Sequence, residues 1–357
     1  MQLGPDELEA AVLGGAMLGG GGGGTMASGL RLGQAALAAG VPRLVPVDEL
    51  DPDALVATVA LVGAPASKTA RVEPGDHARA CELLGRLSVT PLSGIASCEN
   101  GGLATVNGWL QSAELGIPVV DAPADGRAHP TGDMGSIGLD SVHGFESLQG
   151  VSGGNRLAGR YLELQVRGPL GAANRIVRAA ADGAGGLVAV ARNPVAASYL
   201  RQHGACGAIT QAIDIGRRLM TECSGMPGRT ADCLGDLIGA RVLARGPVSH
   251  VEIRTGGGFD VGTARIDTLD LTIWNEYMTA ERDGSRLATF PDLLITLDAK
   301  TGLPVTSAQL FDGLDAIVLA APAARLRLGA GVLVREHLAA IEKVVGRDIL
   351  RFVTGAR

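Results

Sequence analysis

The chain opens with apolar residues at helical spacing. Leu8, Val12 and Ala16 lie about one turn apart and share a face, which predicts a first helix. Asp6 and Glu9 have the spacing of a capping box, so we expect this helix to begin at Asp6. The helix runs directly into six consecutive glycines, after which the apolar pattern resumes.

Beyond the glycines, short apolar runs alternate with longer stretches of helical period. The short runs predict strands at 41–47, 54–62, 89–95 and 117–121, and the longer stretches predict helices at 28–39, 76–87 and 103–115. The run 54–62 is apolar almost throughout, so we expect this strand to be buried on both faces. Strands that alternate with helices are typical of a largely parallel sheet covered by helices. The first part of the chain is therefore predicted to be an α/β lobe.

The hydrophobic pattern changes after about residue 240, where short strand-like runs follow one another. Turn signals such as Gly256-Gly257-Gly258 and Asp283-Gly284 separate them. The pattern predicts a β-rich, mixed α+β C-terminal lobe with strands at 241–244, 249–255, 259–266, 269–274, 293–297 and 316–319, and a final helix at 336–345. A chain of 357 residues has the length of two domains, which we place at 1–165 and 166–357.

Composition argues against two classes of partner. The formal net charge is −6 and aromatic residues make up 3% of the chain, so we expect no nucleic-acid partner. The sequence shows neither an apolar run of the roughly 20 residues that span a membrane nor a signal peptide, so we expect no membrane partner and a cytoplasmic location. The five cysteines include no C-x-x-C pair, which argues against a disulfide framework. Low charge and high apolar content favour a homo-oligomer.

Two loops with reactive side chains each follow a predicted strand. The first holds Cys98 and Glu99, and the second holds Asp121, His129 and Asp133. Sites in open α/β sheets gather at the carboxyl ends of strands, so we expect the two loops to meet. His129, together with Asp121 or Asp133 and with Cys98 or Glu99, has the donor types that bind zinc or another divalent metal. The alternative is a polar surface loop with Asx turns and a structural Arg–Asp pair.

The six glycines are a second candidate. A Gly-rich turn that opens a helix offers backbone N–H groups to negative charge, so Gly22, Gly23, Gly24 and Thr25 are expected substrate contacts. The run is not a Walker A motif, because no Gly-Lys-Ser/Thr follows, and it is not a dinucleotide fingerprint, because it follows a helix. A flexible connection between two helices is the alternative.

The second lobe adds a small polar group inside apolar surroundings. Asn275 and Glu276 are expected either to hydrogen-bond the substrate or to brace the contact between the lobes. His337, on the predicted last helix, is expected to be structural.

Several of these segments occur in an order that is similar to that of a known family. The matching motifs are Leu18 to Gly24, Gly63-Ala64-Pro65, Glu99-x-Gly101-Gly102, Pro118-Val119-Val120-Asp121, Gly126-Arg127-Ala128-x-Pro130, Gly207-Ala208-Ile209-Thr210, Ile215-Gly216-Arg217, Phe259-x-x-Gly262, Asn275-Glu276 and Pro291-Asp292. On these motifs the chain resembles the S-methyl-thiohydantoin desulfurase family over most of its length.

The resemblance implies a zinc-dependent hydrolase, which replaces a methylthio group on a five-membered ring with water. Within it we expect Glu99, Asp121 and Arg127 to be catalytic. Asp121 would be a metal ligand beside His129, Glu99 a ligand or the general base, and Arg127 the group that holds a substrate carboxylate. Asn100, inside the Glu-x-Gly-Gly motif, joins the expected substrate contacts.

The chain departs from the commoner family pattern at Ala122-Pro123, His129 and Thr131, which indicates a distinct subfamily. Two other functions therefore stay open. One is an ATP-dependent ring hydrolase of the hydantoinase or oxoprolinase type, in which the glycines would hold phosphates. The other is a non-catalytic protein that binds a small ring metabolite.

Overall fold

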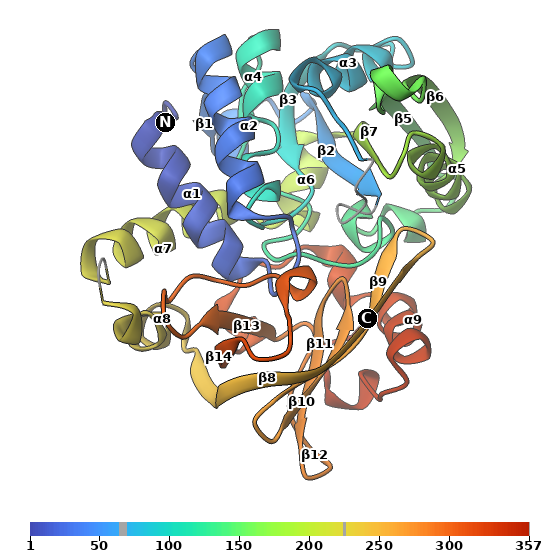
Figure 1. Cartoon of the computed structure of the whole chain (residues 1–357). Helices are drawn as coiled ribbons and strands as arrows, with labels where there is room; N and C mark the ends of the chain where they lie inside the picture. The colour runs from blue at the N-terminus through green and yellow to red at the C-terminus, as the bar shows by residue number, and fades with distance from the viewer. Residues whose placement is uncertain (64–69, 224–225, 357) are drawn as a thin grey trace.

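The computed structural model describes residues 1–63, 70–223 and 226–356 and has two lobes (Figure 1). The first lobe is an α/β lobe and the second is β-rich with a few helices, as predicted. The Gly63-Ala64-Pro65 motif lies only partly within this range, because Ala64 and Pro65 are outside the described residues. In the described part of the chain, no helix combines the length and the apolarity that a membrane span requires.

A seven-stranded sheet forms the first lobe. Its order is β1 (Leu44–Val45), β4 (Val119–Val120), β3 (Leu92–Ser97), β2 (Leu55–Gly63), β7 (Leu187–Ala196), β5 (Glu146–Gly153) and β6 (Leu162–Pro169). The first four of these strands run parallel, as the alternation of strands and helices predicts. The last three join antiparallel and extend the sheet. β6 runs through residue 165 and β7 follows it in the same sheet, so the division at 165 remains a prediction.

Helices cover both faces of this sheet. α3 (Pro74–Gly85) packs on one face, where its Ala80 and Leu84 meet Ala57 and Val59 of β2. α5 (Leu170–Gly183) and α6 (Ala197–His203) pack on the other face. β2 therefore lies between two apolar layers, which confirms the prediction that it is buried on both faces.

The N-terminal helices form a separate layer at the parallel edge. They are α1 (Pro5–Leu18), α2 (Met26–Ala39) and α4 (Trp109–Leu115). The predicted start of α1 is wrong: Glu7, rather than Glu9, accepts the hydrogen bond that closes the first turn, from the N–H of Gly4 at 3.0 Å. Pro5 explains the shift, because its fixed φ angle and missing N–H suit the first helical position.

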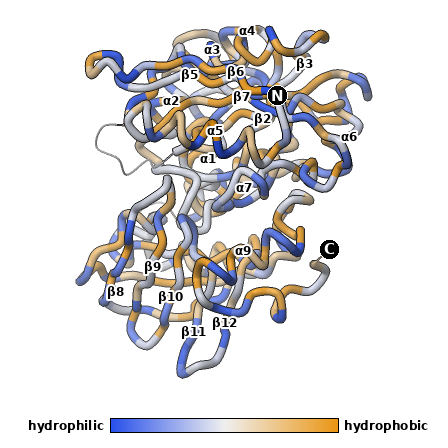
Figure 2. Tube along the Cα trace, turned by 90° about the vertical axis from the view of Figure 1, so that its right-hand side faces the viewer, coloured by the Kyte–Doolittle hydropathy of each residue, from blue (hydrophilic) through white to orange (hydrophobic). Residues whose placement is uncertain are grey.

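A second seven-stranded sheet, antiparallel throughout, forms the C-terminal lobe. Its order is β12 (Ser285–Thr289), β11 (Glu276–Arg282), β10 (Leu269–Trp274), β9 (Phe259–Ile266), β8 (Arg241–Gly256), β14 (Asp315–Ala321) and β13 (Leu293–Asp298). The two strands predicted at 241–244 and 249–255 are one long strand, β8, and β11 and β12 were not predicted. Figure 2 shows the hydrophilic tip of the β11–β12 hairpin at the far end of this lobe.

The lobes share a core rather than meeting at a thin linker. α7 (Ala208–Glu222) packs along α1, and α8 (Thr230–Ile238) leads from it to β8. Residues from α1, α7 and α8 pack in one apolar cluster with residues of β13 and β14. α9 (Arg335–Val345) closes the chain against the C-terminal sheet. This shared core fixes the loops of one lobe relative to the other.

His337 of α9 ties the last helix to a loop of the first lobe. Its Nε2 lies 2.9 Å from Asp140 Oδ2, and its Nδ1 lies 2.7 Å from the carbonyl oxygen of Gly331. Burial acts to lower the pKa of His337, but the bonds to Asp140 and Gly331 outweigh it, so the pKa is raised. The same contact lowers the pKa of Asp140, although burial acts to raise it.

We expect the contribution of this pair to stability to depend on pH. Because the pKa of His337 is raised by folding, its contribution is full below about pH 6.5 and is lost as the pH rises through the folded-state value. Replacing His337 by Gln should therefore lower the free energy of unfolding by about 1 kcal/mol more at pH 6 than at pH 9, in urea titrations of both proteins. Equal losses at the two pH values would show that the charge on His337 does not contribute.

Candidate functional site

The two reactive loops lie side by side at the carboxyl end of β3. The N–H of Ala124 donates to the carbonyl of Ser97, and the N–H of Asp125 donates to the carbonyl of Cys98, each at 3.0 Å. The backbone of the second loop thus pairs with the backbone of the first, as a short additional strand would. This pairing brings two segments about 30 residues apart in sequence to one point, as the strand-end rule predicts.

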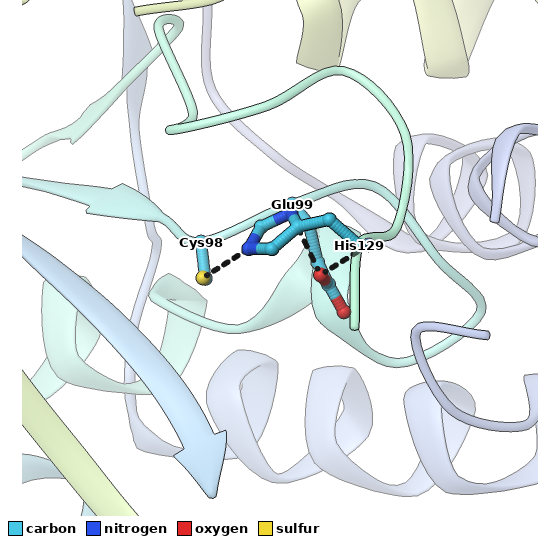
Figure 3. A group of neighbouring side chains, drawn as sticks. All are labelled: Cys98, Glu99 and His129. Atoms are coloured by element: carbon cyan, nitrogen blue, oxygen red, sulfur yellow. Dashed lines mark hydrogen bonds and ion pairs between the residues drawn. The ribbon is translucent and has the colours of Figure 1, made fainter. Parts of the chain in front are cut away.

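Cys98, Glu99 and His129 form a compact group at that point (Figure 3). The Sγ of Cys98 lies 3.6 Å from His129 Nε2. On the other side of the ring, Glu99 Oε2 lies 3.2 Å from His129 Nδ1 and accepts a 3.1 Å hydrogen bond from the backbone N–H of His129. The imidazole therefore stands between a thiol and a carboxylate, with one ring nitrogen facing each.

Burial sets the protonation of this group. The side chain of His129 is 2% exposed, and burial, together with the positive charges of Arg192 and Arg127, lowers its pKa to about 3. Burial raises the pKa of the Cys98 thiol to about 11 and that of Glu99 to about 8. At neutral pH the imidazole is therefore neutral, which is the form that binds a metal ion.

The donor set suits a metal ion of the zinc class. Thiolate, imidazole and carboxylate are the three donors that zinc uses, and its bond lengths at a tetrahedral angle put a sulfur and a nitrogen ligand about 3.5 Å apart. Cys98 Sγ and His129 Nε2 have nearly this separation. A histidine that binds a metal commonly turns its other nitrogen to a carboxylate, and Glu99 lies on that side of His129.

The same three residues also have the order of a thiol nucleophile, a base and an orienting acid. That use requires a thiolate at neutral pH, and the raised pKa of Cys98 opposes it when no metal is bound. A coordinated metal ion removes the thiol proton outright. The metal-binding use is therefore the better match to the burial of Cys98.

Two family models together match most of the chain. Residues 6–151 match the family model described as S-Me-THD-like, N-terminal domain, and residues 170–330 match S-Me-THD-like, C-terminal domain. The chain belongs to the S-Me-THD-like family. A crystal structure of a protein from Chromobacterium violaceum is similar to this S-Me-THD-like chain, with a TM-score of 0.69 and 21% identity over 96% of each chain. At that identity the likeness shows a shared fold only, and no curated protein matches the chain.

Asp121 is not part of the group in this S-Me-THD-like protein, so its expected role as a metal ligand is corrected. Its Oδ1 accepts the N–H of Ile209 at 2.8 Å, and its Oδ2 accepts the hydroxyl of Thr210 at 2.5 Å. These groups belong to the first turn of α7, whose unpaired N–H groups and positive dipole end favour a carboxylate. Asp121 therefore caps α7, which begins more than 80 residues later in the sequence.

We expect replacement of Asp121 by Ala to lower stability and leave metal binding intact. Loss of a helix cap costs about 1–2 kcal/mol, and an Asn at this position keeps one acceptor and should cost less. Urea unfolding and elemental analysis of the Ala and Asn variants check both parts. Loss of metal from a folded Asp121→Ala protein would return Asp121 to the ligand set.

Two further residues that we expected to contact the metal or the substrate, Asp133 and Asn100, have other partners in the structure. The Oδ1 of Asp133 accepts the side-chain N–H of Asn174 of α5 at 2.7 Å, and Asp133 is not a member of the Cys98–Glu99–His129 group. Asn100 is fully buried, and its amide donates to the carbonyls of Gly126 and Ala208 while its oxygen accepts the hydroxyl of Thr105. With its donors and its acceptor engaged by the protein, Asn100 braces the site.

Arg127 is buried beneath the site and mostly bound by the backbone. Its Nε donates to the carbonyl of Ala128, and its Nη1 donates to the carbonyls of Pro291 and Asp292. The guanidinium lies 4.4 Å from the ring centre of Phe290. Only Nη2 has no hydrogen-bond partner in the structure, so Arg127 has one donor left for a ligand rather than the planar fork that we expected.

The glycine run approaches the same region from the first lobe. The carbonyl of Gly20 accepts the N–H of Tyr277, and that of Gly21 accepts the N–H of Ser307, so the run joins the two lobes. A side chain at Gly22 would collide with Glu276, because a Cβ there would lie 1.9 Å from its Oε1. A side chain at Gly22 would have to displace the buried carboxyl group of Glu276, so the two lobes meet closely across this position. Gly24 and Thr25 continue into α2, where Thr25 caps the helix by accepting the N–H of Ser28.

Asn275 and Glu276 differ in whether their side chains are engaged by the protein. Asn275 is structural: its Oδ1 accepts the N–H of Asp260, and its Nδ2 lies 3.4 Å from the carbonyl of Pro130. Glu276 is 3% exposed, and its Oε2 has no hydrogen-bond partner among the described residues. Burial, with the nearby charge of Glu99, raises the pKa of Glu276 well above the ordinary value of a glutamate.

Two residues near the group were not predicted. Asp125 is fully buried, and burial raises its pKa to about 7. Its Oδ2 lies 4.0 Å from His129 Nδ1 and has no hydrogen-bond partner in the part of the chain that the structure describes. Its place four residues before His129 was an available signal. Arg192 donates to Cys98 Sγ at 3.2 Å from the middle of β7. The signal for it was a lone charge directly after the apolar run Leu187–Ala191.

Proposed function

We propose that this protein is a metal-dependent hydrolase of a small five-membered ring of the S-methyl-thiohydantoin or hydantoin class. In the proposed reaction water replaces a thiol on an amidine-like ring carbon. The observation that carries the proposal is the Cys98–His129–Glu99 group, whose donors fit a zinc-class ion at the strand end of an S-Me-THD-like fold. Family membership supports the class of ring, since the thiohydantoin association belongs to the family as a whole.

Cys98 and His129 would hold the ion, and Glu99 would be either a third ligand or the orienting group on Nδ1. The ion, when bound, supplies a water molecule with a pKa near 7 and therefore hydroxide at neutral pH. Glu99 has a pKa of about 8, raised by burial, and is well matched to hold or release a proton in that range. Asp125 Oδ2 lies 4.0 Å from His129 Nδ1 and adds a second carboxyl group near that ring nitrogen.

Arg127 and Glu276 would hydrogen-bond the polar edge of the substrate ring. Among the described residues, Arg127 Nη2 is a buried donor without an acceptor, and Glu276 Oε2 is a buried carboxyl oxygen without a partner. A hydantoin ring presents carbonyl oxygens and N–H groups in alternation, which matches one donor, Arg127 Nη2, and one carboxyl oxygen, Glu276 Oε2. Unsatisfied buried polar groups are costly, so a ligand that satisfies both gains binding energy.

The ATP-dependent alternative has weaker support. A pocket of about 320 Å³ does adjoin the glycine run, lined by Gly21, Gly22, Gly24 and Thr25 on one side and by residues 303–306 and Gln309 on the other. No Lys or Arg is among the described residues that line it, whereas triphosphate sites pair backbone N–H groups with a basic side chain.

Metal analysis with a thiol-release assay tests the proposal. We expect about one zinc-class ion per chain after purification without chelators, and release of methanethiol from an S-methyl-thiohydantoin, followed with a thiol reagent. Removal of the ion should stop the release and its return should restore it. A protein that contains no ion and releases no thiol under any added metal would overturn the hydrolase. Stabilisation by the ring alone would then indicate a binding protein, and stabilisation by ATP with magnesium would indicate the ATP-dependent enzyme.

A further inference from the structure

The sheet of the first lobe ends in a long strand, β6. It is last in the strand order, and in the part of the chain that the structure describes only β5 pairs with it. Its eight residues pair with β5 without a register shift, so the backbone N–H and C=O groups on the other side of β6 form a regular row. Figure 1 shows β6 at the margin of the lobe opposite α1 and α2. Such a row is a template for pairing with another strand.

The other three sheet edges are shielded. Residues 1–3 form backbone hydrogen bonds beside β1, and residues 303–305 do so beside β13. β12 has a register irregularity against β11, and the carbonyl of its Leu287 accepts a hydrogen bond from Arg241 Nη2 at 2.6 Å. Covering segments and bulges are common means by which proteins prevent edge pairing. Among the described residues neither is present at β6, so its edge remains available.

The charges on β6 fit a second copy of the same strand. Charged side chains oppose edge pairing where like charges meet, but β6 carries one charge of each sign. Glu163 and Arg167 are exposed, lie on the same face of the sheet, and stand at equal distances on either side of Gln165. In antiparallel pairing about Gln165, each Glu163 therefore lies opposite Arg167 of the other copy. Registers centred on Glu163 or on Arg167 would instead bring like charges together.

The opposite face of β6 is apolar. Leu162, Leu164 and Val166 alternate with the charged positions. Val166 is buried under α5, whereas Leu162 and Leu164 are only partly buried. In the register about Gln165, Leu164 of one copy lies opposite Val166 of the other. Apolar cross-strand pairs stabilise antiparallel strands, so one register suits both faces.

We propose that β6 is the interface for a second copy of this chain, and that the two β6 strands pair antiparallel about Gln165 and join the two first-lobe sheets into one. The pairing satisfies the outer backbone row, opposes unlike charges and covers partly exposed leucine side chains. It gives the expected homo-oligomer a defined surface. The proposal does not rest on the proposed function, because no residue of the Cys98–Glu99–His129 group lies on β6.

Charge reversal and charge exchange on β6 test the interface. Sedimentation velocity over about a hundredfold range of protein concentration gives the dissociation constant of the wild-type dimer and of each variant. Arg167→Glu places a second carboxylate opposite Glu163 and should raise that constant at least about tenfold. Arg31→Glu, on exposed α2, makes the same change of charge away from β6 and should leave it unchanged.

The double variant Glu163→Arg/Arg167→Glu restores unlike charges between the copies and should recover most of the wild-type affinity. Within one chain, Glu163 pairs with Arg79 at 2.8 Å and Arg167 with Glu146 at 2.6 Å. Both of these pairs stay broken in the double variant. Recovery therefore reports the contact between copies rather than the stability of one chain, and circular dichroism verifies that each variant is folded.

A cross-link at the axis is the second measurement, and it decides the matter if Arg167→Glu does not fold. Directly opposite residues of antiparallel strands have Cα atoms about 4.5–5.5 Å apart, within reach of a disulfide. In Gln165→Cys the two thiols should give up two electrons and two protons to diamide and form one disulfide between the copies. Ser285→Cys, exposed on β12, is the control and should stay uncross-linked. A monomeric wild type, or a dimer that is insensitive to Arg167→Glu and is not cross-linked at residue 165, would overturn the interface.

Discussion

Replacing His129 by Ala is expected to remove the bound metal and to lower the rate of thiol release by at least about 10²-fold. His129 supplies the imidazole of the group, and its two ring nitrogens face Cys98 and Glu99. Without the ring these two side chains have no common partner between them. Elemental analysis of the purified variant and a thiol-release assay measure the two effects, and circular dichroism verifies the fold.

His143→Ala is the matched control, because His143 is an exposed histidine a short way further along the same region. We expect this variant to keep both the metal and the activity. A second comparison, Cys98→Ser, should weaken metal binding while the smaller side chain is accommodated in the same space. If His129→Ala keeps its metal and its activity, the ion lies elsewhere and the proposed group is not the active site.

The elements before residue 122 and many of those after residue 240 were predictable because they depend on local patterns, whereas β5 to β7 and α5 to α8, which lie between them, were not predicted. β9 and β10 have the predicted bounds, since short apolar runs between glycine turns leave few alternatives. β11 and β12 were missed because the run from Glu276 to Thr289 contains charged residues that its β-hairpin places partly at the surface. The tight turn at Asp283-Gly284 was visible in the sequence, and the strands on either side of it were not.

The same contrast between local pattern and tertiary packing applies to the site residues. Cys98, Glu99 and His129 were found because they follow strands, and parallel strands bring their carboxyl ends together. Asp121 occupies an equivalent place in the sequence, but its partners Ile209 and Thr210 come from a helix more than 80 residues later. Arg192 reaches Cys98 from an antiparallel strand. Which carboxylate caps a helix and which faces a ligand depends on tertiary packing, which local spacing does not contain.

The packing of α1 on α7 gives the largest expected effect on stability. The two helices approach so closely at two glycines that a Cβ on Gly14 would lie 1.8 Å from the carbonyl oxygen of Ala212, and a Cβ on Gly216 would lie 1.9 Å from that of Ala10. Both neighbours are backbone atoms, which cannot turn aside. We expect Gly14→Ala or Gly216→Ala to lower the free energy of unfolding by about 2–3 kcal/mol, because the helices must separate and their shared core is disturbed.

Gly85→Ala in α3 is the control, because we expect it to change the free energy of unfolding in the opposite direction. A Cβ at Gly85 meets nothing within 4 Å, so the substitution only restricts the unfolded chain and improves helix propensity. It should raise the free energy of unfolding by about 0.5–1 kcal/mol. Urea unfolding of the three variants therefore gives opposite signs for one chemical change. A neutral or stabilising Gly14→Ala would show that α1 and α7 lie further apart than described. The glycine run that follows α1 would then lose its fixed position against Tyr277 and Glu276.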